Sequence, residues 1–201
     1  MNIKKTTLIL AVMTVFAASP QFSFAQADTK KPDAYTQMLD YSRPGANHEL
    51  LRRITGTWKF HDVQRPFVKG TLTRKPIYNG RFYAIQIKGG KLSVPVADGK
   101  MIEEFYSSQQ IEGYDNVRQK FVMTSINNHI GSDIQFQTGT YDPRTQEFTF
   151  YGESELIRGE VKKDKRILKI IDATHYSETY YEINDGKSEK VRELDNEKTG
   201  D

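Results

Sequence analysis

The sequence predicts an all-β protein: a small closed antiparallel barrel of about nine or ten strands, preceded by a short helix. From Thr57 onward, apolar and polar residues alternate with the period of a half-buried strand. Turn residues separate these segments at spacings of roughly 8–15 residues, which is typical of a sandwich or a barrel. A barrel is favoured because it has no exposed sheet edges. Long helical periods are missing between the segments, which argues against a parallel sheet.

The N-terminus predicts export. Lys4 and Lys5 precede an apolar run, Leu8–Ala18, that is shorter than the roughly 20 residues a membrane-spanning helix needs. Ala25-Gln26-Ala27 then has the small-x-small pattern of a signal peptidase site. Cleavage after Ala27 or after Ala25 fits this pattern, and an uncut anchor is the alternative. We expect a signal peptide over residues 1–27 and a periplasmic or secreted protein.

Charge and cysteine content exclude several functions. Without residues 1–27, 27 Lys and Arg stand against 26 Asp and Glu, so the net charge is near +1. This charge predicts no nucleic-acid partner and no basic patch for anionic lipid. Because the chain has no cysteine, disulfides, thiolate catalysis and lipoprotein anchoring are excluded. No segment after the N-terminal run is apolar enough for membrane insertion.

The first elements are an arm and a short helix. Residues 28–43 form a polar, flexible arm with one helical turn around Tyr35–Leu39, and a single barrel domain covers residues 44–201. Asn47 can cap a helix of two turns. Leu50, Leu51 and Ile54 share its apolar face, and Gly56 ends it.

The strands follow as alternating segments. Hairpin turns are expected where Asn, Asp, Gly or Pro lie between two such segments. The expected strands cover residues 57–62, 81–88, 121–129, 134–140, 148–151, 166–171, 176–183 and 190–194.

A set of short motifs resembles the lipocalin-like (calycin) barrels and, among these, the bacterial domain-of-unknown-function family 1579. The matching strings are Pro44-Gly45-Ala46-Asn47-His48, Leu51, Gly56-Thr57-Trp58, Gly80-Arg81-Phe82, Gly113-Tyr114-Asp115-Asn116 and Gly139-Thr140-Tyr141-Asp142. They span roughly residues 44–195, nearly the whole mature domain. The family has no agreed activity, so the resemblance implies a fold and not a reaction.

The resemblance also implies structural roles for single residues. Trp58 would close one end of the barrel, with a basic residue of the last strand over its ring. Arg192 is the expected partner through a cation–π contact. His48 would cap or fix the helix that plugs the barrel, and Gly56 belongs to the same motif. The family often has Trp and Asp where this chain has Ser125 and Asn127, which suggests a different ligand.

Two strand faces change from apolar to polar along their length. Phe121 and Met123 are followed by Ser125 and Asn127, and Ile134 and Phe136 by Thr138 and Thr140. Such grading is typical of a barrel with a closed apolar end and a wetter mouth. Strands that simply leave the core toward solvent give the same pattern. The expected ligand-binding residues are Trp58, Phe60, Met123, Ser125, Asn127, Phe136 and Thr138.

These features predict a protein that binds a small hydrophobic or amphipathic molecule. An enzyme, such as a hydrolase or isomerase, using the same cavity is one alternative, and an interaction protein with a filled core is another. Four histidines are scattered, and the tight pair Glu153 and Glu155 fits a solvated sheet face better than a catalytic dyad. We expect no catalytic residue, metal site or cofactor, and the sequence does not indicate an oligomeric state.

The export hypothesis makes a direct prediction. Because the cleavage motif lies at 25–27, the exported protein should begin at Asp28 or Gln26. N-terminal sequencing of protein recovered outside the cytoplasm tests this, and a chain that still begins at Met1 would contradict it.

Overall fold

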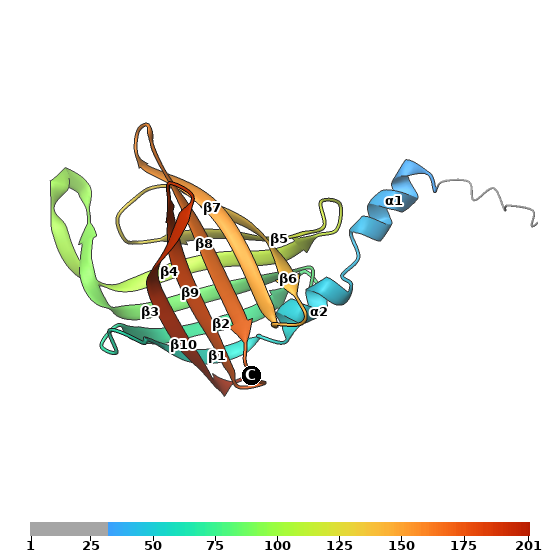
Figure 1. Cartoon of the computed structure of the whole chain (residues 1–201), viewed down its shortest axis with the longest axis horizontal. Helices are drawn as coiled ribbons and strands as arrows, with labels where there is room; N and C mark the ends of the chain where they lie inside the picture. The colour runs from blue at the N-terminus through green and yellow to red at the C-terminus, as the bar shows by residue number, and fades with distance from the viewer. Residues whose placement is uncertain (1–31) are drawn as a thin grey trace, which may run out of the picture. The chain divides into compact units, whose positions relative to one another are not determined.

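The computed structural model describes residues 32–201, in which ten antiparallel strands form one closed barrel (Figure 1). The expected signal peptide, residues 1–27, lies outside the described residues. The strands are β1 Gly56–Asp62, β2 Lys69–Ile77, β3 Phe82–Pro95, β4 Met101–Asp115, β5 Lys120–Asn127, β6 Gln135–Asp142, β7 Glu147–Ile157, β8 Glu160–Ile170, β9 His175–Asn184 and β10 Lys187–Gly200.

Each strand pairs with its neighbours along the chain, and β1 also pairs with β10 to close the barrel. This confirms the expected closed antiparallel barrel. The sequence prediction lacked two strands, β2 and β4. Both are hard to recognise because charged residues and Pro76 interrupt the alternation in β2, and β4 begins in an exposed hairpin with β3. That hairpin extends beyond the barrel wall after a register shift between Lys88 and Lys91 (Figure 1).

Two helices precede the barrel: α1 Ala34–Tyr41 and α2 Ala46–Arg52. Among the described residues, no helix is both long and apolar enough to cross a bilayer. The arm contains all of α1, so it holds more helix than the single turn expected. Asn116 of the β4–β5 turn donates hydrogen bonds to the carbonyls of Tyr41 and Arg43, at 2.8 and 3.0 Å. These bonds fix the end of the arm.

The helix α2 plugs one end of the barrel with Leu51 and with Ile54, which follows it; both are buried in the core. Asn47 is not its cap. Gly45 occupies that position in an extended conformation, and its N–H donates to Nδ1 of His48 at 3.0 Å. The side chain of His48 thus accepts a hydrogen bond from the backbone of the N-cap residue. We call this plugged end the closed end, and the end with the β3–β4 and β7–β8 hairpin tips the open end.

Gly56 does not end the helix, which stops at Arg52. It opens β1 with a φ of +120°, where a Cβ atom would lie 2.5 Å from the carbonyl oxygen of Gly200. The residue is thus needed for the close approach of β10 that closes the barrel.

Aromatic side chains fill the closed half of the interior. Trp58 and Tyr176 meet edge to face with ring centroids 4.6 Å apart, and Phe121 meets Phe148 in the same way at 4.9 Å. Such pairs add specific geometry to the hydrophobic burial. Toward the open end the inward row of β5 continues through Met123 to Ser125, all of it buried, as the grading of this strand predicted.

The residues of β6 that were expected to face the interior were wrong by one position. Gln137 and Gly139 face inward, whereas Phe136 lies on the outer wall with 53% of its surface exposed. The reason is steric, because Gly139 leaves room for the ring of Phe150 on β7. A Cβ at this position would lie 2.8 Å from that ring and 2.4 Å from the Thr149 carbonyl oxygen. Thr138 therefore faces outward with Phe136.

This packing predicts that substitution by alanine destabilises the protein at Gly139 but not at Gly90. Gly139→Ala should lower the free energy of unfolding by about 1–3 kcal/mol, because the new methyl group overpacks a filled core. Gly90→Ala is the control, since no described atom lies within 4 Å of the Cβ it would add, and it should change stability by less than about 0.5 kcal/mol. Urea unfolding measures both, and equal effects would contradict the inward placement of Gly139.

Candidate functional site

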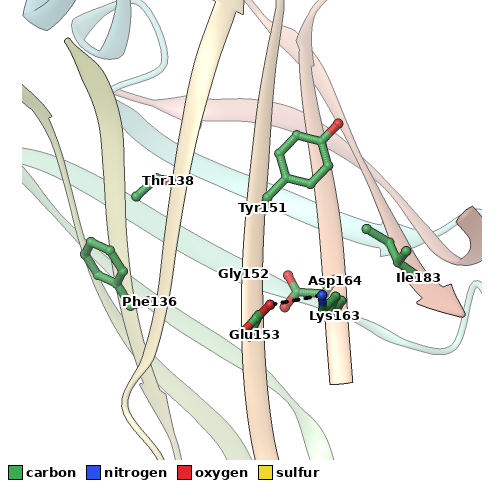
Figure 2. A pocket seen from close by; sticks show the side chains of 8 residues that line it. All are labelled: Phe136, Thr138, Tyr151, Gly152, Glu153, Lys163, Asp164 and Ile183. Atoms are coloured by element: carbon green, nitrogen blue, oxygen red, sulfur yellow. Dashed lines mark ion pairs between the residues drawn. The ribbon is translucent and has the colours of Figure 1, made fainter. Parts of the chain in front are cut away.

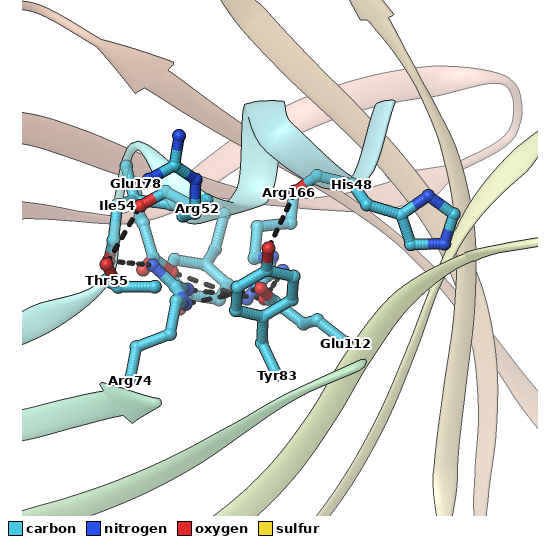
Figure 3. A network of polar contacts seen from close by, with 10 residues as sticks. His48, Arg52, Ile54, Thr55, Arg74, Tyr83, Glu112, Arg166 and Glu178 are labelled. Atoms are coloured by element: carbon cyan, nitrogen blue, oxygen red, sulfur yellow. Dashed lines mark hydrogen bonds and ion pairs between the residues drawn. The ribbon is translucent and has the colours of Figure 1, made fainter. Parts of the chain in front are cut away.

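Four buried charged side chains form one network inside the barrel. They are Arg74 on β2, Glu112 on β4, Arg166 on β8 and Glu178 on β9, each with 5% or less of its surface exposed (Figure 3). Each lies on the inward face of its strand, two residues from another inward side chain. That neighbour is a buried hydrophobic residue for Arg74, Arg166 and Glu178, and a partly buried tyrosine for Glu112. Strand alternation therefore directs all four into the interior.

Glu112 bridges the two arginines. Its Oε1 accepts hydrogen bonds from Arg74 at 3.3 Å and from Arg166 at 3.2 Å, and its Oε2 lies 3.3 Å from Nε of Arg74. Arg166 also forms an ion pair with Glu178 at 3.5 Å. The hydroxyl of Tyr180 donates to Glu178 at 2.5 Å, which extends this ion network toward the open end.

The ion network is also tied to the plug. Arg74 donates to the Ile54 carbonyl at 3.3 Å, and the hydroxyl of Tyr83 donates to the His48 carbonyl at 2.8 Å (Figure 3). The guanidinium of Arg74 also lies 5.7 Å from the ring centroid of Tyr176. The plug and the network therefore share partners.

Electrostatics keep the arginines charged and the tyrosines protonated. Burial alone would lower the pKa of Arg74 and of Arg166, but the nearby carboxylates outweigh it and raise both values. The leading opposing charge is Glu112 for Arg74 and Glu178 for Arg166. Burial raises the pKa of Tyr176 and of Tyr180. The network thus holds two positive and two negative charges.

Three neighbouring side chains carry buried polar atoms that have no hydrogen-bond partner among residues 32–201. These atoms are Nε1 of Trp58, the hydroxyl of Tyr176, and both the Nδ2 and Oδ1 of Asn196. All three residues are 0% exposed. Asn196 pairs with Tyr176 on one side and with Phe60 on the other, so the group spans β9, β10 and β1. Buried polar atoms require a partner, which leaves these atoms to water or to a ligand.

Solvent reaches the inward-facing residues of the open half. Ile87, Gln110, Tyr180 and Arg192 point inward but are only partly buried. Arg192 stacks on the ring of Tyr180, with its guanidinium carbon 4.2 Å from the ring centroid. The interior therefore has a filled closed half and a wetter open half.

Buried polar side chains line this open half. Ser108 lies 3.4 Å from the hydroxyl of Ser125, and Gln137 donates to the carboxylate of Asp164. Burial raises the pKa of Asp164, although the bond from Gln137 opposes that shift. These groups offer polar contacts at the mouth of the barrel.

The structure divides the predicted ligand-binding residues into three places. Trp58, Phe60, Met123 and Ser125 lie inside the barrel. Asn127 is exposed at the open end of β5, where its Oδ1 accepts the N–H of His129 at 2.9 Å. Phe136 and Thr138 lie on the outer wall.

The expected stacking of Arg192 on Trp58 is wrong. Because Trp58 pairs with Lys198 in the β1–β10 register, Nζ of Lys198 lies over the Trp58 ring at 5.9 Å. Arg192 is six residues away along β10, nearer the open end, and therefore meets Tyr180.

The outer wall carries a pocket of about 560 Å³ (Figure 2). An ion pair between Glu153 and Lys163, at 3.5 Å, crosses it. The lining residues are Phe136, Thr138, Tyr151, Gly152, Glu153, Lys163, Asp164 and Ile183. Glu153 thus takes part in a surface ion pair, as a solvated face predicts.

The sequence analysis missed the ion network and Asn196. A signal was present in two strands, since Arg74 stands two residues after Leu72 in β2 and Glu178 two residues after Tyr176 in β9. Four scattered histidines gave no metal motif, and within residues 32–201 no cluster of three or more His, Asp or Glu side chains could hold a metal ion.

The network predicts a large cost for Glu112→Gln. This change keeps the shape of the side chain but leaves two buried guanidinium groups with too little negative charge, so unfolding should become easier by about 3–5 kcal/mol. Glu153→Gln breaks an exposed pair and should cost less than about 1 kcal/mol. Chemical denaturation measures both variants, and similar losses would show that Glu112 does not compensate the arginines.

His48 predicts a pH dependence. Burial lowers its pKa below the ordinary value of about 6.5, and Nδ1 must stay unprotonated to accept the Gly45 N–H. The unfolded chain takes up a proton as pH falls below about 6.5, whereas the folded protein resists it. His48 thus stabilises the fold above this pH and loses that effect in acid.

The test compares the wild type with His48→Asn, which cannot titrate in this range. Their difference in unfolding free energy should shrink between pH 8 and pH 5, an interval chosen to bracket the ordinary histidine pKa of about 6.5. A constant difference would contradict the capping role of a neutral His48.

Comparison with known proteins gives a family and no activity. No curated protein matches the chain. The model of a family described as protein of unknown function, DUF1579, matches residues 43–198. This range covers α2 and nearly all of the barrel, including the ion network and Asn196. The chain belongs to the DUF1579 family.

Proposed function

We propose that this protein is exported and binds a small amphipathic molecule inside the open half of its barrel. The observation that carries the proposal is the set of buried polar side chains in that half, Ser108, Ser125 and Gln137, of which Oε1 of Gln137 has no hydrogen-bond partner among residues 32–201. A buried polar atom without a partner costs about 1–3 kcal/mol, and a ligand that supplies the missing hydrogen bonds removes this cost.

The surroundings support an amphipathic ligand. Phe60 and Met123 offer apolar surface, while Ser108 and Ser125 offer polar contacts farther toward the open end. Binding sites for small molecules combine mostly apolar walls with a few placed polar groups. Because large side chains fill the closed half, the ligand has to occupy the open half and enter from its mouth.

Export is supported by the basic residues, the apolar run and the small-x-small site at the N-terminus. An exported binding protein meets its ligand outside the cytoplasm. Protein recovered from that compartment is therefore the proper material for a test.

Native mass spectrometry of exported protein should show an added small mass that is lost on denaturation. Ser125→Leu should reduce the bound fraction, because its side chain would fill the inward space between Met123 and the mouth. Thr124→Leu, on the outer face of the same strand, is the matched control and should leave binding unchanged. If no mass accompanies the wild type, or if both variants bind equally, the proposal fails.

A further inference from the structure

We infer that the open end of the barrel docks on the surface of a zwitterionic lipid bilayer, with the tips of its strand connections among the lipid headgroups. This inference goes beyond the proposed function and is carried by a different set of residues. The open-end connections follow β1, β3, β5, β7 and β9, and Figure 1 shows them on the side of the barrel away from α2.

Large apolar side chains are exposed at four of these five connections and at the strand ends beside them. Single exposed hydrophobic residues are common on folded proteins, but a concentration of them marks a surface that contacts a partner or a membrane. The most exposed of this set are Phe67, at 78%, and Ile134, at 71%. The set consists of Val63 and Phe67 after β1, Val96, Met101, Ile102 and Phe105 between β3 and β4, Ile130 and Ile134 after β5, and Leu156, Ile157 and Val161 between β7 and β8.

The strand connections at the closed end differ from those at the open end. They follow β2, β4, β6 and β8, and within residues 32–201 they expose only Tyr78, Val117 and Ile171 among the large hydrophobic residues. Hydrophobic exposure is therefore not a general property of the turns of this barrel. Its concentration at one end indicates that this end is covered by something apolar.

The arrangement of the apolar residues favours a lipid surface over a protein partner. They lie on four separate tips around the mouth of a closed barrel, and the hairpin of β3 and β4 extends beyond the wall (Figure 1). A protein would need a matching hollow for each tip, whereas a fluid bilayer accepts separate apolar groups without a preformed shape. The strength of such interfacial binding scales with the apolar area that it buries.

The charges near the tips favour zwitterionic over anionic lipid. Arg65 forms an ion pair with Asp62 at 2.7 Å, and Arg158 lies two residues from Glu160 in the connection between β7 and β8. Anionic lipid is attracted by clusters of basic residues, and these arginines are instead accompanied by acids. Binding should therefore depend on apolar contact and change little with salt.

The lipid contact ends at the tips and does not extend along the barrel wall. Glu153 and Lys163 form an ion pair on the outer wall, and their side chains are 62% and 61% exposed. A barrel that spans a bilayer has an apolar outer band, and charges on that face are costly. The wall thus stays in water while the mouth faces the headgroups. In this position an amphipathic molecule moves between the bilayer and the open half without crossing bulk water.

Vesicle flotation tests the inference. Exported wild-type protein should float with phosphatidylcholine vesicles, to the same extent at low and at high salt. Phe67→Ser combined with Ile134→Ser should lower the partition coefficient at least about ten-fold, because two large apolar side chains no longer enter the interface. Tyr78→Ser combined with Val117→Ser is the matched control at the closed end, where these side chains are 69% and 66% exposed. The control should bind vesicles like the wild type.

A fluorescent reporter locates the contact independently. Trp58 is the only tryptophan in the chain and is buried in the closed half, so its emission gives a constant background. Phe67→Trp should show a blue shift of its emission when vesicles are added, because the new indole leaves water. Tyr78→Trp at the closed end should show no shift.

Several results would overturn the inference. These are a wild type that does not float, equal losses in the two double variants, and binding that requires anionic lipid. Dimers that ignore vesicles and dissociate in the open-end double variant would make this end a contact between two copies of the chain.

Native mass spectrometry separates this inference from the proposed function. Exported protein that carries a small mass but does not float leaves the proposed function standing and overturns the lipid contact. Protein that floats through its open end but carries no small mass supports the lipid contact and overturns the proposed function.

Discussion

The carboxylate of Glu112 is the point on which the interior depends, because it compensates two buried guanidinium groups at once. Barrel closure turns alternate residues of ten strands toward a common axis, and four buried charged residues among them form one network. Glu112 contacts Arg74 and Arg166, Arg74 reaches the plug through the Ile54 carbonyl, and Arg166 reaches Glu178. Plug, wall and open half are thereby joined through one balanced set of charges.

Such a network is an unusual way to stabilise a core. Replacing a buried ion pair by well-packed apolar residues is often neutral or stabilising, because desolvation offsets much of the attraction. The unpartnered atoms of Asn196, Trp58 and Tyr176 add a further cost. Both features destabilise an empty barrel, and both are explained if the interior positions a ligand. The closed half contains the aromatic core, and the open half is where we propose that the ligand binds.

Much of the fold could be predicted from the sequence, and less of the site. Alternation identified strands such as β1 and β5, and the string around His48 identified the plug, because both signals are local. The pairing of Arg74 with Glu112 is not local, since 38 residues separate them, and each charge alone resembles a surface residue. The outward turn of Phe136 was hidden for a related reason: it follows from the space that Phe150, on the next strand, takes above Gly139.

We propose that the ion network serves binding more than stability. Replacing all four charges together, by Arg74→Met, Glu112→Leu, Arg166→Met and Glu178→Leu, tests it in one protein. Unfolding free energy and native mass spectra of the exported variant are the measurement. We expect a barrel of equal or greater stability that has lost its bound molecule. A folded variant that retains the molecule, or one that loses several kcal/mol of stability, would contradict it.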